Sequence, residues 1–232
     1  KPPYRHLDRL TRVYEYMGPA WYQREIEIPA AWKGKRIFLY FERTHWLSSV
    51  YVGKEEVSKI DYISIPHNHE LTQWLHPGKK ELITFCIDNR YQYDTHKWDH
   101  AHSEFTQINW NGVLGEIKLV AVDPVYVDDM QVYPDIKNKS IKVKMTVRNC
   151  TENTASGKIS FHVSGKDYRL QKEVPVTVTD SITYIEEEMF LSKDIHLWNE
   201  FHPNLYTLDC KLTSSVEGQS YAHEKSTTFG MR

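Results

Sequence analysis

Apolar and polar residues alternate along most of this chain with a period of two, which is typical of β-strands. Residues 21–29 alternate and end in a proline, which predicts a strand. Residues 36–41 and 81–88 are apolar on both faces, as in strands buried between two layers. Residues 50–54 predict a strand that runs into a tight turn, and residues 69–75 predict one short helical turn. Strands therefore dominate the first half.

The second half alternates more regularly. Its four clearest strands place apolar residues on one face, and these residues are Ile141, Val143, Met145 and Val147; Ile159, Phe161 and Val163; Val174, Val176 and Val178; and Tyr206, Leu208, Cys210 and Leu212. Short half-buried strands of this kind over about 100 residues are typical of an immunoglobulin-like sandwich. The Asp123-Pro124 pair before them predicts a domain boundary.

Composition excludes several function classes. The 232 residues carry a formal net charge of −2, so charge gives no reason to expect a nucleic-acid or membrane partner. Cys86, Cys150 and Cys210 are far apart and form neither a disulfide framework nor a zinc motif; Cys86 and Cys210 lie in strand patterns and are expected to be buried. The aromatic content of 13% suits both β-sandwiches and carbohydrate binders.

Two polar stretches interrupt the strands. Residues 89–107 have no periodicity, and residues 103–116 combine polar and aromatic side chains with a turn signal at Asn111-Gly112. Long structureless connections tend to be functional. We therefore predict that residues 103–116 form a loop, held by a rigid β scaffold, that faces a sugar.

A metal site is one candidate chemistry. His96, His100 and His102 lie near Asp94 and Asp99, with spacings that could place imidazoles on one side of a loop. A solvated histidine-rich loop explains the same pattern, and no second cluster supports a metal. We favour the loop and expect no metal and no cofactor.

Acid/base or nucleophilic catalysis is the other candidate chemistry. Hydrolysis of a glycosidic bond needs two carboxyl groups about 5–10 Å apart. Residues 186–188 are expected to be a solvated strand edge, Glu42 to pair with Arg43 or another cation, and Glu104 has no evident partner. No nucleophile elbow or phosphate-binding loop occurs. The sequence alone therefore predicts a non-enzymatic scaffold.

Four tryptophans have different expected roles. Trp21 and Trp198 are assigned to packing. Trp98 and Trp110 lie in or beside polar loops, and packing and exposed ring stacking stay equally open for them.

Motifs spread over nearly the whole chain occur in a specific order. They are GPAWYQR (18–24), VYVGK (50–54), NWNGVLG (109–115), LW (197–198) with PNLYTL (203–208), and FGMR (229–232). This series resembles the sugar-binding and second domains of the family 2 glycoside hydrolases, which include β-galactosidases, β-glucuronidases and β-mannosidases. The resemblance implies an all-β fold with a galactose-binding-like jelly-roll sandwich over residues 1–122 and an immunoglobulin-like β-sandwich over residues 123–229.

The resemblance also implies a role. Residues 230–232 would start the linker into a catalytic (β/α)₈ barrel that carries both glutamates, so this chain would be non-catalytic, would dock on that barrel and would add a loop wall to the sugar pocket. Substrate contacts would fall on Glu104, Thr106, Gln107 and Asn109, with Trp110 beside them.

The chain also departs from the family pattern. Gly115 stands where the family usually has Arg, and Asn111 replaces a Gly. The form of residues 103–112 resembles a bacterial polysaccharide-degrading branch, which implies a carbohydrate partner and a periplasmic or secreted protein. A free-standing lectin-like or adhesion module and a protein–protein adaptor are the competing classes.

Overall fold

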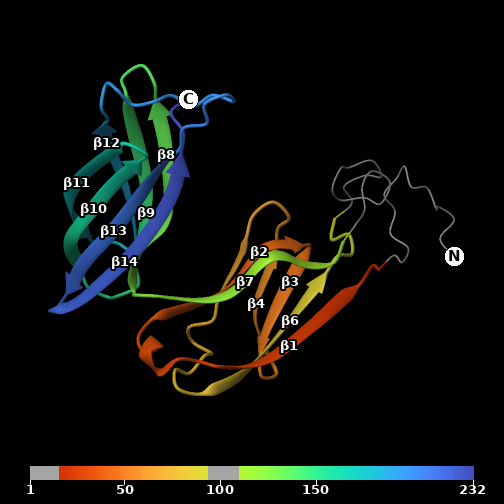
Figure 1. Ribbon diagram of the computed structural model, residues 1–232. Helices are drawn as coiled ribbons and strands as arrows, with labels where there is room; N and C mark the ends of the chain where they lie inside the picture. The colour runs from red at the N-terminus through yellow and green to blue at the C-terminus, as the bar shows by residue number, and fades with distance from the viewer. Residues whose placement is uncertain (1–15, 94–109) are drawn as a thin grey trace, which may run out of the picture. The chain divides into compact units, whose positions relative to one another are not determined.

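The computed structural model describes residues 16–93 and 110–232 (Figure 1). The chain divides into two compact units, Lys1–Ala121 and Val122–Arg232, which are called the first and second units below. Apart from a three-residue 3-10 turn, Ala30–Trp32, the named elements are strands, and they build four antiparallel sheets. The predicted all-β fold class is confirmed. None of the helices in the described ranges is long and apolar enough to cross a membrane.

The first unit is a sandwich of two sheets. Its strands are β1 (Pro19–Glu27), β2 (Arg36–His45), β3 (Leu47–Val52), β4 (Glu55–Asp61), β5 (His67–Glu70), β6 (Lys80–Asp88) and β7 (Gly112–Val122). One sheet has the order β1-β6-β3-β4 and the other β5-β2-β7 (Figure 1). Apart from the hairpin β3-β4, strands consecutive in sequence thus lie in different layers, as expected of a jelly-roll type of sandwich.

Alternation along these strands explains the core between the layers. Ile37, Leu39 and Phe41 on β2 meet Ile83 and Ile87 on β6, and all five are buried. The opposite faces of the same strands are more polar. The period-two pattern therefore fixes which side of each strand is buried.

The second unit is also a sandwich of two sheets. Its strands are β8 (Val125–Asp135), β9 (Ser140–Asn149), β10 (Ala155–Gly165), β11 (Tyr168–Val178), β12 (Ile182–Phe190), β13 (Tyr206–Val216) and β14 (Gln219–Phe229). The sheets have the orders β11-β10-β13-β14 and β12-β9-β8. Alternate residues of β9, β10 and β13 point inward into one apolar core, as the sequence predicts.

The motif residues near the end of the chain pack together in this unit. The Trp198 backbone N–H donates to the Met231 carbonyl at 2.9 Å, and the Arg232 guanidinium lies 4.9 Å from the centre of the Trp198 ring. Met231 is fully buried. The packing role expected for Trp198 is confirmed.

Three expectations need correction. Asn111-Gly112 is not a turn, because β7 begins at Gly112 and runs through residues 113–116. His69 lies in strand β5 rather than in a helical turn, although residues 71–75 do form one turn closed by the bond from Leu75 N–H to the Leu71 carbonyl. Trp21 is 59% exposed and lies outside the core.

Candidate functional site

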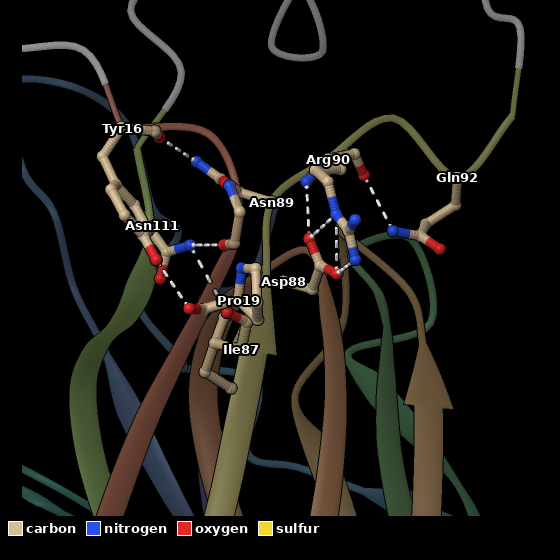
Figure 2. A network of polar contacts seen from close by, with 9 residues as sticks. Tyr16, Pro19, Ile87, Asp88, Asn89, Arg90, Gln92 and Asn111 are labelled. Atoms are coloured by element: carbon tan, nitrogen blue, oxygen red, sulfur yellow. Dashed lines mark hydrogen bonds and ion pairs between the residues drawn. The ribbon is translucent and has the colours of Figure 1, made fainter.

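The candidate site lies at the end of the first unit where β6 finishes and β7 begins. Five residues gather there, and we call them the tip cluster: His45, Asn89, Arg90, Trp110 and Asn111 (Figure 2 labels Asn89, Arg90 and Asn111). Residues 89–93 lead out of β6, and residues 110–111 lead into β7. The cluster therefore holds both flanks of the stretch that the sequence singles out.

Asn89 is the centre of this cluster. It is fully buried, and its Nδ2 donates to the Tyr16 carbonyl at 2.8 Å and to the Trp110 carbonyl at 3.2 Å. Its Oδ1 accepts a hydrogen bond from Gly18 N–H at 2.9 Å. One amide thus ties the chain before β1, the end of β6 and the start of β7 together, and its bond to Tyr16 is drawn in Figure 2. A buried amide with several such bonds is expected to be rigid.

Asn111 makes a similar set of bonds one strand away. Its Nδ2 donates to the Gly18 carbonyl at 2.8 Å and to the Ile87 carbonyl at 3.4 Å (Figure 2). A glycine at this position would lose both bonds. Asn111 therefore acts as a clamp between the chain before β1, the end of β6 and the start of β7.

His45 holds the other side of Trp110. Its Nδ1 lies 2.8 Å from the Trp110 carbonyl, and because a carbonyl only accepts, the proton is on Nδ1. The two rings are 5.1 Å apart at their centroids, and His45 is 1% exposed. Trp110 itself is half-buried. Of the two roles that the sequence leaves open for Trp110, these contacts support ring packing.

Arg90 closes the cluster with an ion pair. Its Nη2 donates to Asp88 Oδ2 at 2.5 Å, its Nε donates to Asp88 Oδ1 at 3.0 Å, and its backbone N–H adds a third bond to the same carboxylate (Figure 2). The guanidinium hydrogen bonds hold the pKa of Asp88 below its usual range. Asp88 is therefore a fixed anion near neutral pH and not a proton donor.

Most of the predicted site residues lie outside the described residues. Glu104, Thr106, Gln107 and Asn109 fall there, and so do His96, His100 and His102 of the metal hypothesis with Asp94 and Asp99. Trp110 is described and belongs to the tip cluster. Within residues 16–93 and 110–232, no group of three or more His, Cys, Asp or Glu side chains could hold a metal ion.

Gly115 has a steric reason for its identity. Its φ is +83°, and a Cβ built on it would overlap the Glu42 carboxylate. That carboxylate accepts a hydrogen bond from the Glu116 backbone N–H at 2.9 Å and also pairs with Arg43 at 3.2 Å. The predicted pairing of Glu42 with Arg43 is confirmed. Glu42 occupies the space that any side chain at position 115 would need.

A second polar cluster lies between the two sheets of the first unit, and no local pattern in the sequence predicts it. His67 and His69 on β5 are both fully buried, and so is Ser48 on β3. Ser48 Oγ lies 2.6 Å from His67 Nδ1 and 2.8 Å from His69 Nε2. We call these three residues the inter-sheet cluster.

Proton counting fixes the tautomers in the inter-sheet cluster. The Tyr62 carbonyl only accepts, so His67 Nε2, 2.8 Å away, carries the proton and Nδ1 accepts from the Ser48 hydroxyl. Ser48 Oγ then accepts from His69 Nε2–H, and His69 Nδ1 accepts from the Ser58 hydroxyl at 2.8 Å. Every donor has one acceptor when both histidines are neutral. Burial lowers the pKa of His67, and it lowers the pKa of His69 to about 3.

The inter-sheet cluster does not have the geometry of an accessible catalytic pair. The Ser48–His67 pair resembles half of a nucleophilic triad, but both residues are fully buried and no substrate reaches them. Asp88 lies next to the tip cluster, and hydrogen bonds from Arg90 hold its carboxylate in place. The tip cluster provides a rigid backbone support for the chain between residues 93 and 110.

Residues 125–232, almost all of the second unit, match the family model described as glycosyl hydrolases, family 2. The chain as a whole is similar to glycosidases of this group. It is 22% identical to a β-galactosidase of Thermoanaerobacter pseudethanolicus over 88% of this chain and 27% of that protein. It is 21% identical to a β-glucuronidase of Paenibacillus borealis over 95% of this chain and 37% of that protein.

Solved structures show the same architecture. β-Glucuronidase 2 of Bacteroides uniformis, solved with a covalently bound cyclophellitol-6-carboxylate aziridine, matches with a TM-score of 0.76 at 17% identity, over 94% of this chain and 27% of that chain. A family 2 member from Bacteroides cellulosilyticus matches with a TM-score of 0.75 at 18% identity, over 94% and 29%. The resemblance predicted from the motifs is confirmed, and the chain spans about a quarter of the length of several such proteins.

Proposed function

We propose that this chain is the non-catalytic N-terminal region of a retaining glycosidase. In this proposal the first unit contributes one wall of the sugar pocket and docks on a catalytic (β/α)₈ barrel, and the second unit is a spacer. The main support is that the buried amide of Asn89 is bonded to the Trp110 carbonyl, which ties the chain before residues 94–109 to the chain after them. A functional loop on a rigid frame is the usual way to place contacts accurately.

The proposed sugar contacts are Glu104, Thr106, Gln107 and Asn109, with Trp110 packed beside them. Carboxylate and amide side chains suit sugar hydroxyls because they accept and donate paired hydrogen bonds. The barrel would supply both catalytic glutamates. A polysaccharide-derived substrate would be met in the periplasm or outside the cell.

The test uses the chain joined to the sequence encoded downstream of Arg232. Glu104→Ala and Gln107→Ala are expected to lower kcat/KM on a β-glycoside by about 10-fold or more, because each removes a hydrogen bond to the sugar. Gln73→Ala, an exposed residue of the same unit, is the control and should leave kcat/KM unchanged. The 232-residue chain alone should not release a chromogenic aglycone. Unchanged kcat/KM in both site variants would refute the proposed wall.

A further inference from the structure

The outer face of the sheet β1-β6-β3-β4 carries two aromatic rings that the core does not use. Trp21 on β1 is 59% exposed, and its ring lies 5.5 Å from that of Tyr51 on β3 at an angle of 43°. The strand between them is β6, where Trp21 is paired with Cys86 and Tyr51 with Thr84. Residues of β6 that face the core have odd numbers, such as Ile83 and Ile87, so these rings lie on the opposite face.

Cys86 shows how the two rings are arranged. It points away from the core, yet it is only 8% exposed. Cys86 is paired with Trp21 on β1 and with Ser49 on β3. Ser49 lies two residues before Tyr51 on the same strand. The ring pair bridging β6 therefore shields the thiol, and burial raises the pKa of Cys86. Trp21, Tyr51 and Cys86 together form a small apolar surface, which we call the ring platform.

Hydrogen-bonding groups surround the ring platform. Gln23 lies two residues from Trp21 on β1, and its Nε2 donates to Thr84 Oγ1 at 2.8 Å, which leaves the amide oxygen and a second N–H for other partners. The Tyr51 hydroxyl donates to Glu56 Oε2 at 2.5 Å, so its oxygen remains an acceptor. Lys59 on β4, opposite Ser49, adds a cation. Donors and acceptors thus lie on both sides of the rings.

This combination fits a sugar better than a protein. Pyranose rings have C–H faces that pack on aromatic rings, while their edges carry hydroxyls that need paired donors and acceptors. A stable protein interface needs roughly 800 Å² per partner with an apolar centre. The apolar surface here is the ring pair together with Leu82 on β6, which is 40% exposed, and Gln23, Glu56 and Lys59 lie around the rings. Glu25 pairs with Lys80 at 3.5 Å, and Glu56 and Lys59 have opposite charges, so the charges around the rings nearly balance and favour a neutral sugar over a uronate chain.

We propose that the ring platform is a binding site for neutral β-linked hexose oligosaccharides, in which Trp21 and Tyr51 stack on successive sugar faces and Gln23 and Glu56 bind their hydroxyls. The site lies on the sheet face and does not involve the proposed pocket wall. It would hold a polysaccharide chain near the enzyme rather than select the bond to be cleaved.

Isothermal titration calorimetry on the 232-residue chain tests this proposal, with 1,4-β-galactotetraose and cellotetraose as neutral probes and tetragalacturonate as the anionic one. We expect at least one neutral probe to bind and tetragalacturonate to bind more weakly. Trp21→Ala should weaken binding by about 10-fold or more, and Trp21→Phe, which keeps a ring, by less. Gln23→Ala should weaken it by a few-fold.

Control substitutions separate the ring platform from the other surfaces of the chain that could hold a sugar. Tyr184→Ala, which removes an 80% exposed ring of the second unit, should leave the affinity unchanged, and Gln107→Ala is the comparison that separates the ring platform from the proposed wall. Trp21→Ala should also make the Cys86 thiol reactive toward a thiol reagent when Cys150, the exposed cysteine, is replaced by Ser. Binding of neither neutral probe, or equal affinity in wild type and Trp21→Ala, would overturn the proposal. Loss of binding in Gln107→Ala would place the sugar in the loop and overturn it as well.

Discussion

The two units bury very different kinds of side chain. In the first unit, the buried polar residues within the described ranges are Thr44, His45, Ser48, Ser49, His67, His69, Asp88 and Asn89. In the second unit they are Ser140, Asn149 and Ser214, and the rest of its core is a larger set of Val, Ile, Leu, Met and aromatic residues. The second unit is held mainly by apolar packing. In the first unit, buried polar side chains take the place of part of the apolar packing. Their hydrogen bonds fix the tip and join the two sheets.

This difference fits the different tasks proposed for the two units. Apolar packing suits a spacer, because any well-filled core keeps such a unit rigid. Buried hydrogen bonds are directional, so they fix the positions of chosen backbone atoms such as the Trp110 carbonyl. Stability experiments that report on each unit separately can test this contrast.

The largest effect is expected from truncating the apolar core of the second unit. Phe161 is 1% exposed, so Phe161→Ala should lower the free energy of unfolding of that unit by about 3–5 kcal/mol. Hydrogen exchange followed by mass spectrometry would detect faster exchange in β9, β10 and β13. Lys211→Ala, an exposed change on β13, should have an effect of at most about 0.5 kcal/mol. Equal effects of the two variants would contradict a unit held mainly by apolar packing.

A smaller effect is expected from removing the centre of the tip cluster. Asn89→Ala deletes three hydrogen bonds and leaves buried backbone groups unpaired, which should cost about 2–3 kcal/mol in the first unit. Exchange should accelerate at the end of β6 and the start of β7, while the second unit is unaffected. Asn68→Ala, an exposed asparagine on β5, is the matched control. If exchange at β6 and β7 stayed the same, Asn89 would not be the clamp described above.

The third effect is a dependence on pH, which is absent at neutral pH and grows as the pH falls. His67 and His69 have pKa values below 6.5 in the folded state, about 3 for His69, so the unfolded state binds more protons between those values. The stability of the first unit should therefore be full above pH 6.5 and fall as the pH drops, with a limiting slope of about 1.4 kcal/mol per pH unit for each histidine. Urea unfolding at about pH 7, 6 and 5 measures this slope.

Two substitutions isolate the source of that slope. His69→Gln removes one titrating group and should flatten the dependence, whatever it does to the stability near neutral pH. His202→Gln, at an exposed histidine of the second unit, should leave the slope of the first unit unchanged. A full slope in His69→Gln would mean that the inter-sheet cluster is not its source.

The strands are largely predictable from the sequence, because one buried face per strand leaves a period-two pattern. That pattern does not say which face is buried when both carry large side chains. The size of Trp21 predicts packing, but Ile26 and Ile28 mark the buried side of this part of the chain. The glycines mislead in another way: Gly112 and Gly115 read as loop residues, yet their positive φ values occur inside β7.

The polar interior is hardly predictable. The segment around His67 and His69 looks like an exposed stretch, and only Ser48 and Ser58, distant in sequence, make its burial possible. Trp110 and Asn111 stand out through family resemblance, whereas Asn89 looks like the end of a strand. Its three partners come from two segments far from it in sequence, residues 16–18 and Trp110, and no local pattern encodes such a meeting point.

The contact between Glu42 and Gly115 constrains how this chain can vary. Because the carboxylate lies where a Cβ on Gly115 would be, and because the φ of Gly115 is positive, a side chain at position 115 requires the Glu42 side chain to move. A relative with arginine at the second position must carry a shorter residue, or a differently directed one, at the first. Paired changes at these two positions would therefore distinguish branches of the family that share this arrangement of β2 and β7 from those that do not.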